Sequence, residues 1–259
     1  MKRLLLSLLL LAAAFRADAT DYTDLWYTPS ESGWGVNLVQ SDNFMFATFF
    51  IYGSNGSPIW YSAGLDRNAT TGAFSGDLNT TFGTYFAVPW VPANFGGSKV
   101  GTATFTPSTT NAYQGTLTYT VTGVGTIIKQ IERQTLTKVV LGGAYNGGQS
   151  GAYAGCTLAS DNYAYIDRYD LTVTQLGNNS ATFVFNYLSG LSCTLAGTIE
   201  QHGKQYRIPS ATYTCTDGLN TTASMSEIKA TSLGIEGRYF APSVGGGCKE
   251  SANFAAVLN

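Results

Sequence analysis

The residues best suited to bind a ligand lie in one short segment and its continuation downstream. Trp26, Tyr27, Glu31 and Trp34 fall close together, and Trp60-Tyr61 and Trp90 follow. Aromatic faces stack on sugar rings and planar ligands, and a few polar groups beside them fix the orientation of the ligand. The candidate ligand-binding residues are Trp26, Tyr27, Glu31, Trp34, Trp60, Tyr61 and Trp90.

The same segment has a purely structural interpretation. Aromatic residues dominate hydrophobic cores whatever a protein does, so the tryptophans would also suit a core or a plug at the end of a barrel. Gly33 and Gly35 flank Trp34 and permit unusual backbone angles or a close approach of strands. On this interpretation Glu31 caps a turn or pairs with Arg133 or another base.

Signals for catalysis are weak. The single histidine, His202, stands beside Gly203 in a predicted hairpin turn, which disfavours a histidine-dependent triad. The chain has no G-x-S-x-G elbow, H-E-x-x-H motif, phosphate loop or dinucleotide fingerprint. We therefore expect no catalytic residue, metal or cofactor. A hydrolase with paired carboxylates remains an alternative, but spacing selects no pair among Asp24, Glu31, Asp66, Asp77 and Glu132.

The four cysteines all lie in the second half of the chain and predict two disulfides. Four cysteines allow three connectivities. Cys193 and Cys215 flank the turn at 202–204 almost symmetrically, so we expect them to face each other across a hairpin. That leaves Cys156 with Cys248. Zinc binding is the rival interpretation, but no C-x-x-C spacing is present.

The N-terminus has the pattern of a cleaved signal peptide over residues 1–19. Lys2 and Arg3 precede an apolar run from Leu4 to Phe15, and the small-x-small sequence Ala17-Asp18-Ala19 ends it. The run is shorter than the roughly 20 residues of a membrane-spanning helix. We therefore expect a secreted or periplasmic protein without a transmembrane segment in the mature chain.

The net charge of the chain argues against a polyanionic partner. Removing Lys2, Arg3, Arg16 and Asp18 from 14 basic and 16 acidic residues leaves a net charge of −4. Such a chain has no general attraction for nucleic acid or an anionic membrane.

Hydrophobic alternation predicts an almost entirely β protein. The period of two is clear in Thr116–Thr122 and recurs at Leu171–Thr174, Phe183–Tyr187 and Ala103–Phe105. The segment Phe44–Tyr52 is apolar on both faces and predicts a strand covered on each side. Turn signals separate the strands, at 42–43, 55–56, 96–97, 177–179, 189–190, 202–203 and 217–218.

These strands predict antiparallel meanders closed into barrels, of the lipocalin or avidin kind, or packed as sandwiches. We expect two such modules, at 20–138 and 139–259, because cysteines appear only after a glycine-rich stretch that begins at Gly142. An outer-membrane barrel also shows alternation and many aromatic residues. The cysteines and the terminal Asn259, which is not aromatic, argue against that class.

The motif Trp26-Tyr27-Thr28-Pro29-Ser30-Glu31-Ser32-Gly33-Trp34-Gly35-Val36-Asn37, continued by Pro58-Ile59-Trp60-Tyr61, resembles a known module. It is similar to W-W-x-P-x-E-S-G-W-G-x-N and G-x-P-x-W-Y in a family of exported bacterial proteins without an established activity. The likeness extends to Pro89-Trp90, 100–103, 115–119 and 129–134. Elements of the second half, at 193–194, 213–218 and 234–238, resemble a companion segment in some members. Tyr27 replaces the second tryptophan and Glu132 a usual threonine. The resemblance implies an exported compartment and a β fold but no chemistry.

Three functions follow as hypotheses. The leading one is an exported non-catalytic binding protein that presents an aromatic-lined cavity or face to a small molecule or glycan. The alternative is a structural or protein-interaction module of the cell envelope, with an envelope protein as partner. The second alternative is the hydrolase with paired carboxylates.

Overall fold

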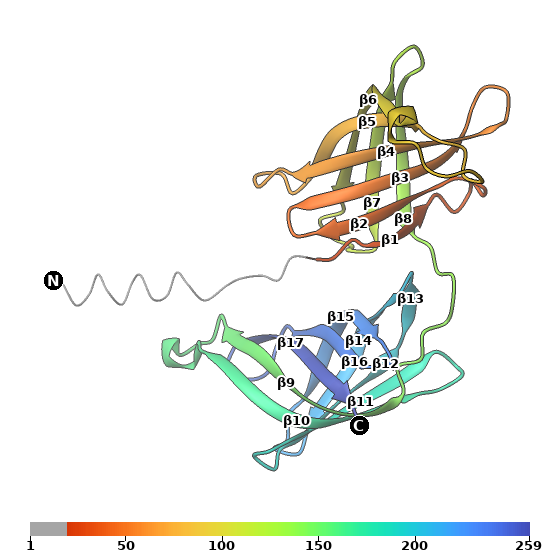
Figure 1. Cartoon of the computed structure of the whole chain (residues 1–259). Helices are drawn as coiled ribbons and strands as arrows, with labels where there is room; N and C mark the ends of the chain where they lie inside the picture. The colour runs from red at the N-terminus through yellow and green to blue at the C-terminus, as the bar shows by residue number, and fades with distance from the viewer. Residues whose placement is uncertain (1–19) are drawn as a thin grey trace. The chain divides into compact units, whose positions relative to one another are not determined.

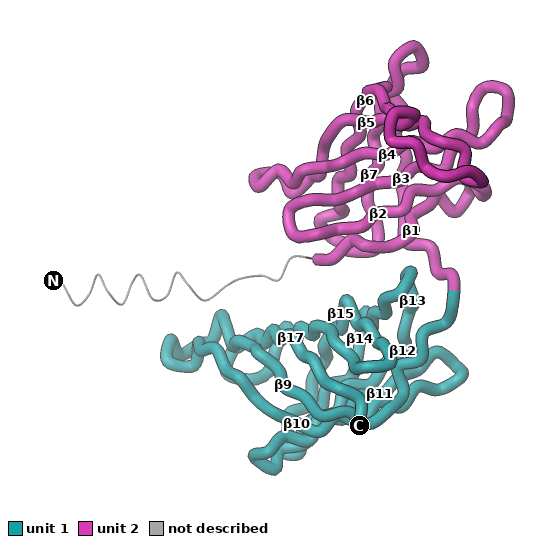
Figure 2. The backbone as a smooth tube through the Cα atoms, in the orientation of Figure 1, with its two compact units in different colours: residues 1–18, 137–259 teal, residues 19–136 magenta. Residues whose placement is uncertain are grey.

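The computed structural model describes residues 20–259, so the predicted signal peptide lies outside the described residues. The chain is nearly all β, with 62% strand and 2% helix. It forms two compact units that divide between Leu136 and Thr137 (Figure 2). Each unit is a closed antiparallel barrel of eight strands.

The first barrel, barrel 1, is an up-and-down meander in which every strand pairs with its neighbours in the sequence (Figure 1). It closes where β1 pairs with β8, through Trp26 opposite Arg133 and Tyr27 opposite Glu132. Its strands are β1 (Asp24–Tyr27), β2 (Gly35–Ser41), β3 (Phe44–Tyr52), β4 (Pro58–Arg67), β5 (Phe74–Phe82), β6 (Gly96–Pro107), β7 (Gln114–Val121) and β8 (Gly125–Arg133).

The second barrel, barrel 2, has the same meander with one short extra strand. The ring closes through β12 with β14 and β9 with β17, and β13 pairs only with β14. The strands are β9 (Gly143–Ala154), β10 (Ala164–Gln175), β11 (Ser180–Tyr187), β12 (Ser192–Thr198), β13 (Glu200–His202), β14 (Gln205–Cys215), β15 (Asn220–Ala230), β16 (Gly234–Ala241) and β17 (Lys249–Leu258). Two single-turn 3-10 helices, η1 (Pro92–Asn94) and η2 (Ala159–Asp161), are the helical segments of the described chain.

The turn chemistry explains most of the chain reversals. Gly56, Gly190, Gly203 and Gly218 adopt positive φ at predicted hairpin turns, which glycine does without steric cost. The turn predicted at Gly96-Gly97 is wrong, because these residues open strand β6. A Cβ on Gly96 would lie 2.3 Å from the ring of Phe82, its register partner, so the glycine makes room for that ring.

The prediction that the segment Phe44–Tyr52 is covered on both faces is wrong. The bounds of strand β3, Phe44–Tyr52, are as expected, but only one of its faces is covered. Met45, Ala47 and Phe49 are buried in the barrel, whereas the alternate aromatic residues are exposed. In a single closed sheet only the inward face has other strands to pack against, so a strand with two apolar faces leaves one of them outside.

One end of barrel 1 is closed by aromatic packing around Trp26, which is fully buried. Its ring lies 5.2 Å from that of Phe105, and the ring of Tyr22 lies 5.4 Å from Phe105. Arg133 stacks over Trp26 at 5.0 Å, and its Nη1 donates to Oδ2 of Asp24 at 3.3 Å. Both charged side chains are buried, so this pair joins the first and last strands inside the closed end.

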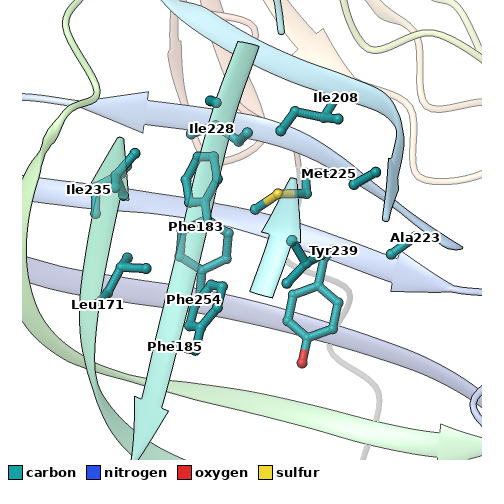
Figure 3. Close-up of a cluster of buried hydrophobic side chains, with 14 of the residues drawn as sticks. Leu171, Phe183, Phe185, Ile208, Ala223, Met225, Ile228, Ile235, Tyr239 and Phe254 are labelled. Atoms are coloured by element: carbon teal, nitrogen blue, oxygen red, sulfur yellow. The ribbon is translucent and has the colours of Figure 1, made fainter. Parts of the chain in front are cut away.

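Barrel 2 has its own hydrophobic core, built from inward residues of all eight strands of the ring (Figure 3). Phe183, Phe185 and Phe254 pack edge to face, with ring centroids 5.6 to 6.2 Å apart for the pairs with Phe254. The segment before β9 covers one end of this core. There Leu141 is fully buried, and its carbonyl accepts a hydrogen bond from the hydroxyl of Tyr145.

Both predicted disulfides are confirmed. Cys193 and Cys215 are register partners on β12 and β14, and Cys156 joins Cys248 across the start of β17. The two bonds fit an oxidising, non-cytoplasmic compartment. Within residues 20–259, no helix is long and apolar enough to cross a membrane.

The Arg133–Asp24 pair generates a stability prediction. Arg133→Met leaves the carboxylate of Asp24 buried without its cation, so we expect barrel 1 to lose about 3–5 kcal/mol of unfolding free energy. All four tryptophans lie in barrel 1, so urea denaturation followed by tryptophan fluorescence reports on this barrel alone. Lys99→Met, in the exposed pair with Asp77, is the control and should cost less than about 1 kcal/mol. Equal losses in the two variants would contradict the assigned role of Arg133.

Candidate functional site

The two ends of barrel 1 differ in character. At the end opposite the Trp26 plug, β1 gives way to β2, β3 to β4, β5 to β6 and β7 to β8. We call this end the mouth of barrel 1. Six of its apolar side chains pack against the core but are only partly buried. They are Trp34, Ile51, Tyr61, Val100, Val121 and Ile127.

Glu31, Trp34 and Lys129 form the polar centre of the mouth. One carboxylate oxygen of Glu31, Oε2, accepts hydrogen bonds from Trp34 Nε1 at 2.8 Å and from Lys129 Nζ at 2.5 Å. The ammonium of Lys129 also lies 5.5 Å from the centroid of the Trp34 ring. Glu31 therefore pairs with Lys129 and not with Arg133, which lies at the closed end.

The loop between β1 and β2 is shaped to place these groups. The backbone amide of Glu31 donates to the carbonyl of Thr28, and Gly33 adopts a φ of 100°, a conformation that favours glycine. Gly35 permits the next strand to approach β1, because a Cβ there would lie 3.0 Å from the carbonyl oxygen of Trp26. The glycines of the motif therefore have a structural role that also positions Trp34.

Two tyrosines face the same end of the lumen. Tyr61 and Tyr119 occupy inward positions on β4 and β7, and the ring of Tyr119 packs edge to face on Phe49 at 5.4 Å. Among residues 20–259, neither hydroxyl has a hydrogen-bond partner. Lys129 uses one of its three N–H donors on Glu31. The mouth therefore holds several donors that remain available to a ligand.

The charges of the mouth shift two pKa values. The hydrogen bond from Lys129 lowers the pKa of Glu31 below its ordinary value of 4.5. Burial raises the pKa of Tyr119 above 10.0, and the negative charge of Glu31 adds to that effect. Around neutral pH Glu31 is therefore a carboxylate and Tyr119 a neutral phenol.

The other predicted site residues lie elsewhere. Trp26 is the buried plug of the closed end, and Tyr27 is half-buried where β1 ends. Trp60 points outward from β4 and is 64% exposed. Trp90, 60% exposed, lies in the loop between β5 and β6 with its ring 6.2 Å from that of Phe95. Of the predicted set, the structure brings Glu31, Trp34 and Tyr61 to the mouth.

The carboxylates proposed for hydrolysis do not gather in one place. Asp24 is paired with Arg133 at the closed end, and Glu31 lies at the mouth. Asp77 pairs with Lys99 on the outer wall, at 2.6 Å. Asp66 is exposed and Glu132 half-buried, both at outward positions of their strands.

Barrel 2 contains a buried polar cluster that sequence reasoning missed. Glu250 is 2% exposed, and its carboxylate accepts hydrogen bonds from the hydroxyls of Tyr165, Tyr239 and Tyr213. Gln149 donates to Tyr239 and Tyr165 at 3.1 and 3.3 Å. Figure 3 shows the Tyr239 ring at the edge of the hydrophobic cluster, with its hydroxyl directed away from it.

Burial raises the pKa values of the tyrosines in this cluster well above 10.0, and the charge of Glu250 contributes to each. The tyrosines therefore remain neutral hydrogen-bond donors to the carboxylate. Acidic residues are rarely buried unless they are paired, so Glu250 marks this end of barrel 2 as unusual.

A hollow of about 830 Å³ spans β10, β9, β17, β16 and β15 of barrel 2, and its lining includes Tyr165 and Tyr239 of the Glu250 cluster. Small polar residues such as Ser150, Ser226 and Asn253 also line it. Its one cation, Arg238, pairs with Glu227 at 3.4 Å.

The lowered pKa of Glu31 predicts a local transition in acid. The ionised carboxylate and its bond to Trp34 persist above the lowered pKa and are lost as the pH falls through it, so the indole N–H resonance of Trp34 should titrate below pH 4.5. An NMR titration measures this shift. Glu31→Gln should abolish the transition, and a transition that survives in the variant would refute the assignment.

The sequence was also compared with known proteins. No protein-family model matches it, and the search of curated proteins found no match either.

Proposed function

We propose that the chain is an exported, non-catalytic binding protein whose mouth of barrel 1 takes a small molecule or glycan. The observation that supports this most is the convergence of unused donors on a partly buried aromatic surface. Lys129 lies beside the ring of Trp34, and Tyr61 and Tyr119 occupy inward positions at the same end of the barrel. At the closed end, by contrast, the guanidinium of Arg133 is fully buried and donates to Asp24 and to two backbone carbonyls.

The donors define the chemistry of the ligand. An ammonium and two phenols favour a carboxylate, a carbonyl or sugar hydroxyls as acceptors, and the indole of Trp34 favours a flat or weakly polar face beside them. Such a ligand would compete with Glu31 for Lys129. We therefore propose a ligand with an oxygen acceptor next to a ring.

Export is supported by two independent features. Residues 1–19 have the pattern of a signal peptide, and barrel 2 contains two disulfides. A secreted or periplasmic location follows as part of the proposal.

Thermal-shift measurements with benzoate, indole-3-acetate, N-acetylglucosamine and cellobiose test the proposal. We expect at least one of them to stabilise the protein and Lys129→Met to weaken its binding about tenfold, as loss of a charged hydrogen bond would. Tyr119→Phe should weaken binding by a smaller factor.

Trp60→Phe is the matched control because Trp60 points away from the lumen at the same end of the barrel. It should leave affinity unchanged. The proposal fails if none of the four compounds binds at 10 mM (about 2.7 kcal/mol of binding free energy). It also fails if Lys129→Met binds as tightly as the wild type.

A second function, the envelope interaction module, is favoured by the outer face of β3 and β4. Phe50 and Trp60 are register partners there, and Phe46 and Tyr52 extend the same face. All are 46 to 64% exposed. Contiguous exposed aromatic residues are uncommon on monomeric proteins and mark interaction sites. We call this face the outer aromatic stripe.

Site-specific photo-crosslinking tests the stripe. A photoreactive phenylalanine analogue at position 50 should give a discrete crosslinked envelope protein in the producing cell. The same analogue at Thr118, on the outer wall of β7, is the control. Equal or absent crosslinking at the two positions would count against an interaction role.

A further inference from the structure

The buried cluster around Glu250 forms the floor of one end of barrel 2. At this end β9, β11, β14 and β16 terminate and β10, β12, β15 and β17 begin. Glu250, Gln149 and the hydroxyls of Tyr165, Tyr213 and Tyr239 make up the floor. We call this end the mouth of barrel 2.

A second layer of side chains lies above this floor. The rings of Tyr163, Tyr153 and Tyr165 follow one another, with centroids 5.2 Å apart in each contact. Tyr153 is the register partner of Glu250, so this row of rings stands directly beside the buried carboxylate. Tyr153 and Tyr165 are half-buried and Tyr163 is exposed, so solvent reaches part of each side chain.

Asp167 is a second carboxylate at this end of barrel 2. It alternates with Tyr165 and Tyr169 along β10 and so occupies an inward position, yet it is exposed. The reason is that β10 extends beyond the end of β11. Tyr187, the last residue of β11, is opposite Tyr169, and residues 164–168 of β10 pair in register only with β9. The Asp167 carboxylate therefore faces the mouth with solvent in front of it.

The hydrogen bonds of the floor occupy its hydroxyl groups. Tyr165, Tyr213 and Tyr239 donate to Glu250, and Tyr187 donates to the amide oxygen of Gln149 at 3.2 Å. Gln149 Nε2 donates in turn to the oxygens of Tyr165 and Tyr239, so the tyrosines offer a ligand chiefly the negative faces of their rings.

The charge of the mouth is uncompensated. Within residues 20–259, neither Glu250 nor Asp167 forms an ion pair. The field of both carboxylates reaches the tyrosines between them, since each raises the pKa of Tyr153 and of Tyr187. A buried carboxylate without a cation gives a strong local negative potential because little water screens it.

We propose that the mouth of barrel 2 binds a small organic ammonium ion, with Asp167 and the rings of Tyr153 and Tyr165 in contact and Glu250 acting from the floor. Carboxylates and aromatic faces attract ammonium groups together, and the attraction is greatest where the cation is partly desolvated. This site is distinct from the mouth of barrel 1, whose unused groups are donors and suit the opposite charge.

The two disulfides support a preformed site. Cys193–Cys215 lies on β12 and β14 at this end, and Cys156–Cys248 joins the segment after β9 to the residue before β17. They therefore restrain the strands that contribute Tyr213, Tyr153 and Glu250. A rigid mouth loses less conformational entropy on binding.

Two probe pairs, each matched in shape and differing in charge, test the proposal. Choline is compared with 3,3-dimethylbutan-1-ol, and butylammonium with butan-1-ol, by calorimetry and by NMR of the full mature chain. At least one cation should bind about tenfold more tightly than its neutral partner, and its shift changes should centre on Tyr153, Tyr163 and Tyr165.

Asp167 is exposed and Tyr153 is half-buried, so substitutions at these two positions carry little risk of misfolding. Asp167→Asn and Tyr153→Leu should each weaken cation binding several-fold, and Glu250→Gln should weaken it about tenfold if that variant folds. Tyr119→Phe, in the mouth of barrel 1, keeps the Lys129–Glu31 pair and should leave cation affinity unchanged, which separates this test from that of the proposed function.

Three results would overturn the proposal. The first is that neither cation binds below about 50 mM, a binding free energy of less than about 2 kcal/mol. The second is that the neutral partners bind equally well. The third is that Asp167→Asn and Tyr153→Leu both retain wild-type affinity.

Discussion

Each half of this chain is one sheet hydrogen-bonded to itself, and this closure determines where everything else can lie. A closed sheet has no edge and only one face that other strands can cover, so each strand divides its residues strictly between lumen and surface. Closure of barrel 1 depends on the short contact between β1 and β8, where Trp26, Arg133 and Asp24 combine an aromatic stack with a buried ion pair. The same division places Lys129 and Glu250 inside a lumen and leaves Phe46, Phe50 and Trp60 on the outer wall.

Local sequence signals predicted the strands, most turns and the Cys193–Cys215 disulfide because these depend on residues close in the sequence. The Cys156–Cys248 disulfide joins residues 92 positions apart and was predicted by elimination. Alternation identifies β7, and the symmetric spacing of Cys193 and Cys215 around a turn identifies their pairing. The outer face of β3 could not be predicted, because a segment that is apolar on both faces reads the same whether one face or two are covered. Whether the second face is covered depends on how many sheets pack together, and this is a property of the whole fold.

The residues of the two barrel mouths were predicted only in part, for a similar reason. The motif drew attention to Glu31 and Trp34, but Lys129 and Glu250 were missed because each is a charge at an inward position of its strand. The signal was present: Lys129 stands between Ile127 and Ile131, and Glu250 alternates with Ala252 and Phe254. A single charge within an apolar alternation is easily assigned to the surface, and only register and closure show that it faces the lumen.

The nested order of the disulfides has a consequence for how the chain matures. Cys156 leaves the ribosome 92 residues ahead of Cys248, and both members of the inner pair appear between them. Oxidation in order of appearance would join Cys156 to Cys193. Cys215 and Cys248 would then form a second incorrect bond. A correctly bonded product therefore requires either that β12 and β14 pair early enough to capture Cys193 and Cys215, or that an isomerase exchanges the first bond formed. Barrel 1 has no cysteine and can mature without either step.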